Sequence, residues 1–312
     1  MLTAQVSHLL DPDPVRALDL IHARLKEETV FGIGGILAAR LRCFAGAYPD
    51  LVDQVVHDAA LGPWLEPSDD EGAHVDGLAL NGFIGVVLFL ALCEDTPNAR
   101  ALAGSWFEEP TASRICHRAL LRVKGFLIDD DAKVRERAAA LLLTAATAAE
   151  EIRVSAEPDS EGLGKAFSVA SKICATVRRS CENHRARSTR VSGPPEGVLA
   201  DVLPILSELS RFREPSIVHD AVQTFAVLAP QDPRAVLGCL RGMVDVGDPY
   251  AYDSLAQEAT IALCARYLAE FWEDVMDVPD SLTALREVIG VFVRAGWPEA
   301  IGLSRRLGEA FR

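Results

Sequence analysis

Histidine and cysteine are common ligands of protein-bound zinc, but their spacing in this sequence does not match a metal site. The chain holds seven histidines and seven cysteines, with no His-Glu dipeptide, no HExxH motif and no CxxC pair. The zincin type of metal site is therefore excluded. Cys181 and His184 lie three residues apart, on one helical face, but no further ligand follows at zinc-site spacing. We expect no metal and no other cofactor.

A second candidate for chemistry is the acidic segment Asp69–Asp76, which also contains Asp70, Glu71 and His74. Carboxylate oxygens are the ligands that hard cations such as Ca²⁺ prefer. A solvated loop is the simpler interpretation, because no other ligand-type residues converge on the segment. An enzyme or a metal-dependent protein with an acidic site near Asp69–Asp76 is kept as an alternative.

Motifs for nucleophilic catalysis and for phosphate binding are missing. No serine lies in a GxSxG motif. Cys116 and His117 are adjacent, so on a helix their side chains diverge by about 100° and cannot pair as thiol and base. The glycines within Phe31–Leu37 form half of a dinucleotide-binding fingerprint, and no GxxxxGK[ST] occurs. We therefore expect no catalytic residue and a chain that is not an enzyme.

The segment Arg178–Arg190 is rich in arginine, although the net charge of the whole chain is −14. Arginine is suited to bidentate recognition of carboxylate or phosphate, so we predict that this segment contacts an anionic partner. The alternative is a solvated helix end whose cations complement the helix dipole. The predicted contact residues are Arg178, Arg179, Arg185, Arg187 and Arg190.

The elements that must position these residues are all predicted to be helices. Apolar residues recur with the helical period, alternating strand patterns are scarce, and proline-bearing turns interrupt the chain at short intervals. The predicted fold class is therefore all-α, with about a dozen helices or more. The turns include Asp11–Pro14, Tyr48–Asp50, Thr96–Pro97, Glu214–Pro215, Ala229–Pro233, Val278–Pro279 and Trp297–Pro298.

The sequence also indicates a compartment. The longest apolar run, Gly82–Cys93, is shorter than the roughly 20 residues that span a bilayer, so we expect a buried helix and no membrane association. The first residues lack the features of a signal peptide. An odd number of scattered cysteines is typical of buried free thiols in a reducing, cytoplasmic compartment. Low lysine usage and abundant alanine suggest a bacterial genome of high GC content.

Three segments of the chain look alike: Asp11–Ile21, Asp129–Leu141 and Arg213–Phe225. Each has an acidic or proline-bearing turn, then Val followed by Arg or His, then a stripe of apolar residues. The separations of their valines, 119 and 84 residues, are near-multiples of a period of about 40–47 residues. Weaker matches are Pro49–His57, Thr96–Leu102, Val177–Arg178 and Tyr252–Ala259.

In these segments the chain resembles the HEAT and armadillo families of helical repeats, most closely at Asp129–Leu141. The resemblance implies an α-solenoid: helical repeats at 1–190, a linker loop at 191–197, and further repeats at 198–312, stacked continuously. It also implies that Arg16 and Arg135 have a structural role, bonding within their turns. The function implied is that of a non-catalytic scaffold or adaptor that binds a protein through its concave face.

Nucleic acid is a less suitable partner. Neutralising phosphates requires a basic face, and the chain has 45 acidic residues against 31 Lys and Arg. A HEAT-like nucleic-acid-binding protein, kept as a further alternative, needs stacking aromatics, and these are only 6% of the residues.

Overall fold

The prolines predicted to begin helices do begin them. In the computed structural model, helices start at Pro14, Pro49, Pro97, Pro215 and Pro233, and also at Pro279 and Pro298. Proline is tolerated at this position because the amide it lacks has no partner within the helix, and its fixed φ suits the first turn.

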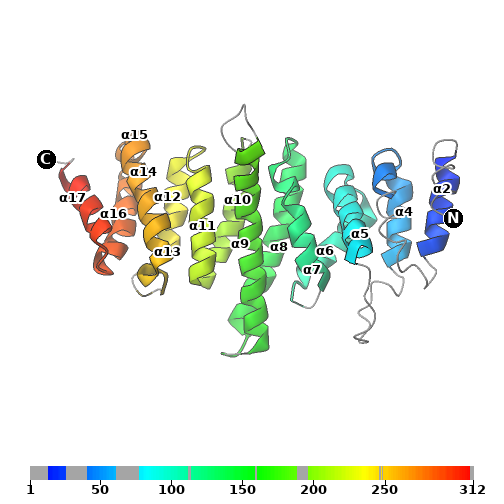
Figure 1. Cartoon of the computed structure of the whole chain (residues 1–312), viewed down its shortest axis with the longest axis horizontal. Coiled ribbons are helices and arrows are strands. Elements are labelled where there is room, and N and C mark those ends of the chain that lie inside the picture. Colours follow the sequence, from blue (N-terminus) through cyan, green and yellow to red (C-terminus); the bar gives the residue numbers. More distant parts are fainter. Residues whose placement is uncertain are drawn as a thin grey trace. The chain divides into compact units, whose positions relative to one another are not determined.

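The structure describes residues 13–25, 41–60, 77–111, 114–158, 160–187, 196–245, 247 and 249–309, and these residues are helical without any strand (Figure 1). The predicted all-α class is thereby confirmed. By its internal contacts the chain divides into two units, Met1–Val123 and Lys124–Arg312.

The first unit is built around its most apolar helix. In this unit α4 packs on α2 and α6, while α5 packs on α6 and α7. The run Gly82–Cys93 is buried in it, as predicted, with Phe83, Ile84 and Leu88 almost wholly covered. Its helices are α2 (Pro14–Leu25), α4 (Pro49–Ala60), α5 (Gly77–Phe89), the π-helix η2 (Leu90–Glu94), α6 (Pro97–Glu108) and α7 (Arg114–Val123).

No single helix of the described residues is long and apolar enough to cross a membrane. The segments Leu80–Glu94 and Pro97–Glu108 pass that test of length and composition only when joined, and they are bent by 116° at their junction.

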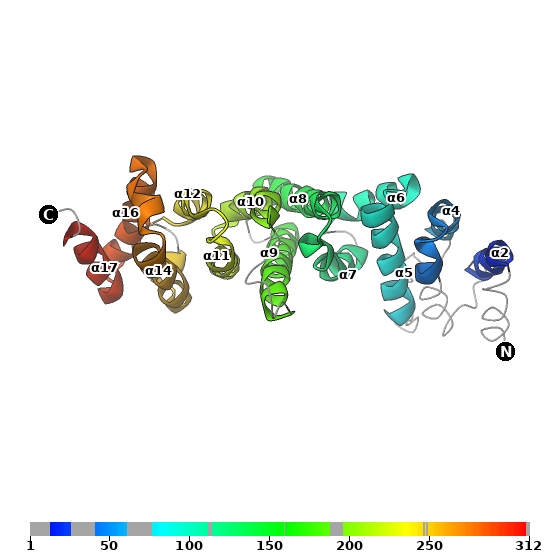
Figure 2. The same cartoon turned by 90° about the horizontal axis from the view of Figure 1, so that it is seen from above.

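The second unit has two layers of helices. Figure 2 shows α8, α10 and α12 side by side in one layer and α9 and α11 in the other. The long helix α8 packs on both α9 and α10, and α9 packs on α11. Farther along, α12 packs on α16, and α16 packs on α17.

In the second unit, the helices that start at Pro215, Pro233, Pro279 and Pro298 begin at predicted turns. The full bounds of its elements are as follows. They are η3 (Phe126–Ile128), α8 (Ala132–Ser155), α9 (Glu161–Arg187), α10 (Val198–Leu209), η4 (Ser210–Phe212), α11 (Pro215–Leu228), α12 (Pro233–Met243), η5 (Pro249–Tyr252), α13 (Ser254–Ala256), η6 (Gln257–Ile261), α14 (Ala262–Glu270), α15 (Trp272–Met276), α16 (Pro279–Arg294) and α17 (Pro298–Glu309).

The expected linker 191–197 lies between α9 and α10 in the sequence, and its residues 191–195 lie outside the described residues. The weak repeat match Val177–Arg178 lies in the middle of α9 and therefore does not begin a helix.

Candidate functional site

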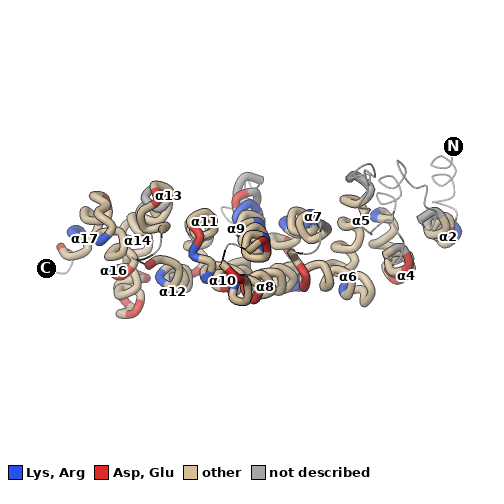
Figure 3. Tube along the Cα trace, turned by 90° about the horizontal axis from the view of Figure 1, so that it is seen from below, with Lys and Arg blue, Asp and Glu red and all other residues tan. Residues whose placement is uncertain are grey.

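The predicted basic segment begins on the longest helix described, α9, which has 27 residues. One side of α9 is buried against α8 and α11, with Ala166, Ile173 and Val177 fully covered. Lys165, Lys172 and Arg179 lie on the solvent side and are exposed. Figure 3 shows Lys and Arg positions along this helix.

Arg178 faces α11 rather than solvent alone. Its Nε atom lies 3.0 Å from Oδ1 of Asp220 on α11, and Nη1 donates to Oε1 of Glu182 at 3.3 Å. The Arg178 side chain is 27% exposed. Because its charge is already paired with two carboxylates, Arg178 ties α9 to α11 and has little capacity left for a partner.

The structure separates the five predicted contact residues. Arg179 is exposed and points about 100° away from Arg178 around the helix axis. Arg185 and Arg187 belong to the last turn of α9, but their side chains are outside the description, and so is the whole of Arg190.

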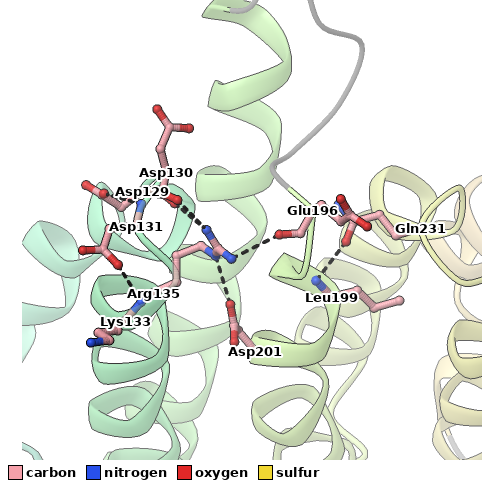
Figure 4. Close-up of polar contacts among 9 residues, drawn as sticks. All are labelled: Asp129, Asp130, Asp131, Lys133, Arg135, Glu196, Leu199, Asp201 and Gln231. Carbon is pink, nitrogen blue, oxygen red and sulfur yellow. Dashed lines mark hydrogen bonds and ion pairs between the residues drawn. The ribbon is translucent and has the colours of Figure 1, made fainter.

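A second cationic centre, at Arg135, holds two helices of the second unit together (Figure 4). Arg135 is only 6% exposed. Its Nη1 donates to the carbonyl oxygens of Asp129 at 2.8 Å and Asp130 at 3.3 Å, and Nη2 donates to that of Glu196 at 3.1 Å. Its Nε donates to Oδ2 of Asp201, on α10, at 3.1 Å. The expectation that Arg135 bonds within its turn is confirmed.

Neighbouring residues complete the same junction. The Asp131 carboxylate caps α8 by accepting from the Lys133 amide at 2.9 Å. At the start of α10 the Leu199 amide donates to Oε1 of Gln231 at 3.0 Å. The contacts drawn in Figure 4 therefore all lie at the starts of α8 and α10, which makes this a structural junction.

The other arginine expected to be structural behaves differently. At Arg16 the bond formed is from the backbone amide to Oδ1 of Asp13, at 3.0 Å, and the side chain is exposed. That bond caps α2, but the Arg16 guanidinium takes no part in it.

Sequence reasoning missed several long-range bonds made by buried or half-buried polar groups. Arg266 donates to the Ala226 carbonyl at 2.6 Å across 40 residues, and Trp297 donates to the Ala251 carbonyl at 2.8 Å across 46 residues. In the first unit the Thr96 hydroxyl donates to Asp53 at 2.7 Å across 43 residues. Each partner lies 40 to 46 residues away, so no local pattern in the sequence points to these bonds.

The thiols of the second unit are not set up for nucleophilic chemistry or metal binding. Burial raises the pKa of Cys181 and of Cys264 to about 12, and that of Cys239 to about 11. Burial also raises the pKa of Cys174, whose thiol donates to the Ile217 carbonyl at 3.3 Å. These groups are protonated thiols at neutral pH, whereas the thiolate is the reactive form.

Other sequence candidates fall outside the described residues. They are the acidic segment Asp69–Asp76, the glycine-rich segment Phe31–Leu37 and the side chain of His184. Within the described part of the chain, no group of three or more His, Cys, Asp or Glu is placed to hold a metal ion.

Comparison with protein-family models, with curated proteins and with solved structures finds no match for this chain. The resemblance to helical-repeat families therefore depends on the three similar segments of the sequence alone.

Proposed function

We propose that the chain is a HEAT- or armadillo-like α-solenoid that acts as a non-catalytic scaffold and binds a protein partner. Such repeats present an extended surface made by one layer of helices, and their binding does not require a catalytic centre. The fold alone does not define the function, so the proposal depends on how the polar groups are used.

The observation that carries the proposal is a group of side-chain bonds between helices at separations of 40–46 residues, which occur beside others at 32, 34 and 66 residues. Side-chain bonds join Asp53 to Thr96 across 43 residues, Cys174 to Ile217 across 43, Arg234 to Asp274 across 40 and Trp297 to Ala251 across 46. A repeat of about 40–47 residues places equivalent positions of adjacent hairpins beside one another. Recurrent bonds at this separation are what a stack of such hairpins requires.

The use of the buried charged groups also supports a binding role. Arg135 and Asp53 bind helix ends, and Arg178 joins two helices. An enzyme would instead concentrate perturbed titratable groups at one cavity. The charged side chains that remain exposed are carried on packed helices, where they are available to a binding partner.

The proposed partner contact is the predicted arginine segment without Arg178, namely Arg179, which is exposed, together with Arg185, Arg187 and Arg190. Arg178 is left out of this set because it is paired with Asp220 and Glu182. A cluster of arginines in a chain of net charge −14 favours an acidic partner surface.

The test is capture by the full-length chain, compared with a variant in which Arg179, Arg185, Arg187 and Arg190 are all changed to Glu. We expect a protein that the original chain retains to be lost from the variant. The helical melt of the variant is measured beside it and should be unchanged. The matched control changes Arg305 and Arg306, both exposed on α17, to Glu and should retain the protein. Equal retention by all three chains would contradict the proposal.

A further inference from the structure

Three apolar side chains of the second unit are exposed where η5, α13 and the start of α17 come together. Tyr252, the last residue of η5, is 59% exposed, Leu255 of α13 is 41% exposed, and Ile301 of α17 is 42% exposed. Single apolar residues on a surface need no explanation, whereas a contiguous apolar patch rimmed by polar groups is typical of an interaction site.

The indole of Trp297 connects the elements that carry these side chains. Its Nε1 donates to the carbonyl of Ala251 at 2.8 Å, and Ala251 directly precedes Tyr252. The Ile301 amide donates to the Trp297 carbonyl at 3.1 Å, so Ile301 lies one helical turn after Trp297. In addition, η5 packs on α13, which carries Leu255. The three exposed side chains therefore lie around Trp297 as one surface.

The sequence around this surface is acidic. Between Arg241 and Arg266 the chain contains four acidic residues and no Lys, Arg or His. Between Arg294 and Arg305 its only charged residue is Glu299. A surface made from these two segments therefore has a negative charge of its own.

The carboxylates at the edge of the surface are available to a partner. Glu258 and Glu299 are exposed, and neither is hydrogen-bonded or ion-paired within the described part of the chain. Asp253 accepts from the Leu255 amide at 2.8 Å, which holds its carboxylate between Tyr252 and Leu255.

The arginines that border these segments do not neutralise the carboxylates. Arg266 is paired with Glu270 at 2.8 Å. Arg294 extends back along α16, where its Nη1 lies 3.3 Å from a Cβ added at Gly290. Arg305 is exposed on α17 and limits the acidic region on that side.

We propose that this acidic–apolar surface, made by Tyr252, Leu255 and Ile301 with Glu258 and Glu299 at its edge, binds a basic amphipathic helix of a protein partner. The tyrosine and the aliphatic side chains can bury against the apolar side of such a helix. The exposed carboxylates attract its Lys or Arg side chains. The inference goes beyond the proposed function, because the arginine segment favours an acidic partner surface and this surface favours a basic one.

Other occupants fit the acidic–apolar surface less well. Its carboxylates repel the phosphates of a nucleic acid and of an anionic membrane. The net charge of −14 opposes association with a second copy of the chain.

The test uses the full-length chain and two fluorescent synthetic peptides that contain Leu and Lys in identical numbers. In one peptide the leucines follow the helical period and line one side of the helix, and in the other they are scattered around it. We expect the amphipathic peptide to bind at least about tenfold more tightly, and its affinity to fall as salt rises from about 50 to about 200 mM. Equal affinity would mean that net charge alone attracts both peptides and would overturn the proposal, as would a failure of both to bind.

The surface itself is tested with two variants. Tyr252→Ser/Ile301→Ser should bind the amphipathic peptide no more tightly than the scattered one, because the apolar contact is lost. Glu258→Gln/Glu299→Gln should weaken binding several-fold and reduce its dependence on salt. An unchanged melt shows that each variant is folded.

Matched controls come from exposed residues of α8 in the same unit. Val154→Ser removes an apolar side chain that is 70% exposed, and Glu136→Gln/Glu151→Gln removes two exposed carboxylates. Both controls should bind the amphipathic peptide like the original chain. A loss of affinity as large as that of the surface variants would overturn the proposal.

Sedimentation of the chain without peptide tests the remaining occupant. We expect the original chain and Tyr252→Ser/Ile301→Ser to sediment as the same species at every concentration. If the original chain self-associated and this variant did not, the surface would be an interface between copies and the proposal would be overturned.

Discussion

In each unit a buried charged side chain holds the start of a helix, and these two side chains carry charges of opposite sign. In the first unit Asp53 of α4, 3% exposed, receives the Thr96 hydroxyl at 2.7 Å and the amides of Ala99 at 2.8 Å and Asn98 at 3.2 Å. These groups belong to the start of α6. An anion is stabilised there by the free amides and by the positive end of the helix dipole.

In the second unit Arg135 of α8 binds at the start of α10. A cation cannot accept hydrogen bonds from helix amides, so Arg135 instead donates to carbonyl groups of two turns and to the carboxylate of Asp201. The amide of Leu199 is served separately by Gln231.

The difference shows that the backbone groups available at a helix start determine whether an anionic or a cationic side chain binds there. Free amides at α6 select a carboxylate, and free carbonyls beside α10 select a guanidinium. In both cases a charged residue on one helix holds the start of another helix of the same unit.

The largest effect is expected from breaking the cationic junction with Arg135→Met. The substitution keeps much of the side-chain bulk but leaves the Asp201 carboxylate and three carbonyls without their donor. We expect the free energy of unfolding of the second unit to fall by about 3 kcal/mol. Urea unfolding measures the loss, and hydrogen exchange should locate it at α8 and α10.

The control for this change is Lys133→Met, at an exposed position two residues earlier on α8. It should alter the free energy of unfolding by no more than about 0.5 kcal/mol. A loss of similar size in both variants would mean that the junction adds nothing specific.

How much the sequence predicts differs between these two junctions. The turn before α8 carries local signals, since Asp131 caps the helix and Arg135 follows in a repeat-like pattern. Its structural role could therefore be predicted. Asp53 could not be found in this way, because its partners lie 43 to 46 residues farther along and its own helix gives no sign of its burial.

The candidate site was predictable only in part, for the same reason. Composition and helical period identified the basic segment and placed it on a helix. They could not show that Arg178 turns toward Asp220 while Arg179 stays exposed, because that depends on which helix packs beside α9.

The second largest effect is expected from Asp53→Ala, which breaks the junction held by the Asp53 carboxylate. The change removes the acceptor of one hydroxyl and two amides in a buried place. We expect a loss of about 2 kcal/mol, with hydrogen exchange faster in α4 and α6 and unchanged in α8 and α10. Asp53→Asn should lose less, since one oxygen remains to accept.

The matched control is Asp50→Ala, in the exposed first turn of the same helix. That change should cost well under 1 kcal/mol, through the helix dipole alone. If Asp53→Ala loosened the second unit as much as the first, the two junctions would not be separable.

A smaller effect tests how closely Arg135 is fitted to its surroundings. Gly197 has a φ of +88°, and a Cβ added there would lie 3.2 Å from Nη2 of Arg135. Gly296 has the same φ of +88° and nothing within 4 Å of an added Cβ. Both Gly→Ala changes should cost about 1 kcal/mol for the backbone, with a further fraction at Gly197.

A double-mutant cycle isolates that fraction. In a background of Arg135→Met, the cost of Gly197→Ala should fall toward that of Gly296→Ala, because the crowded guanidinium is gone. If the costs of Gly197→Ala and Gly296→Ala still differed by the same amount in that background, the crowding at Gly197 would come from another group.

The smallest effect contrasts these partnered charges with the half-buried thiol of Cys239, which is kept neutral. Burial raises the pKa of the Cys239 thiol to about 11, whereas an unfolded thiol titrates near about 8.5. Above pH about 8.5 the unfolded chain releases this proton and the folded chain retains it, so rising pH favours unfolding. The contribution of the neutral thiol to the free energy of unfolding is complete below that pH and is lost progressively toward pH about 11.

Between pH 7 and pH 9 the free energy of unfolding of the original chain should therefore fall by about 1 kcal/mol more than that of Cys239→Ala, measured by urea unfolding with a reductant present. Replacing the thiol changes stability at every pH, but only the difference in slope reports the titration. Equal slopes for the two chains would mean that Cys239 ionises in the folded protein as readily as in the unfolded one.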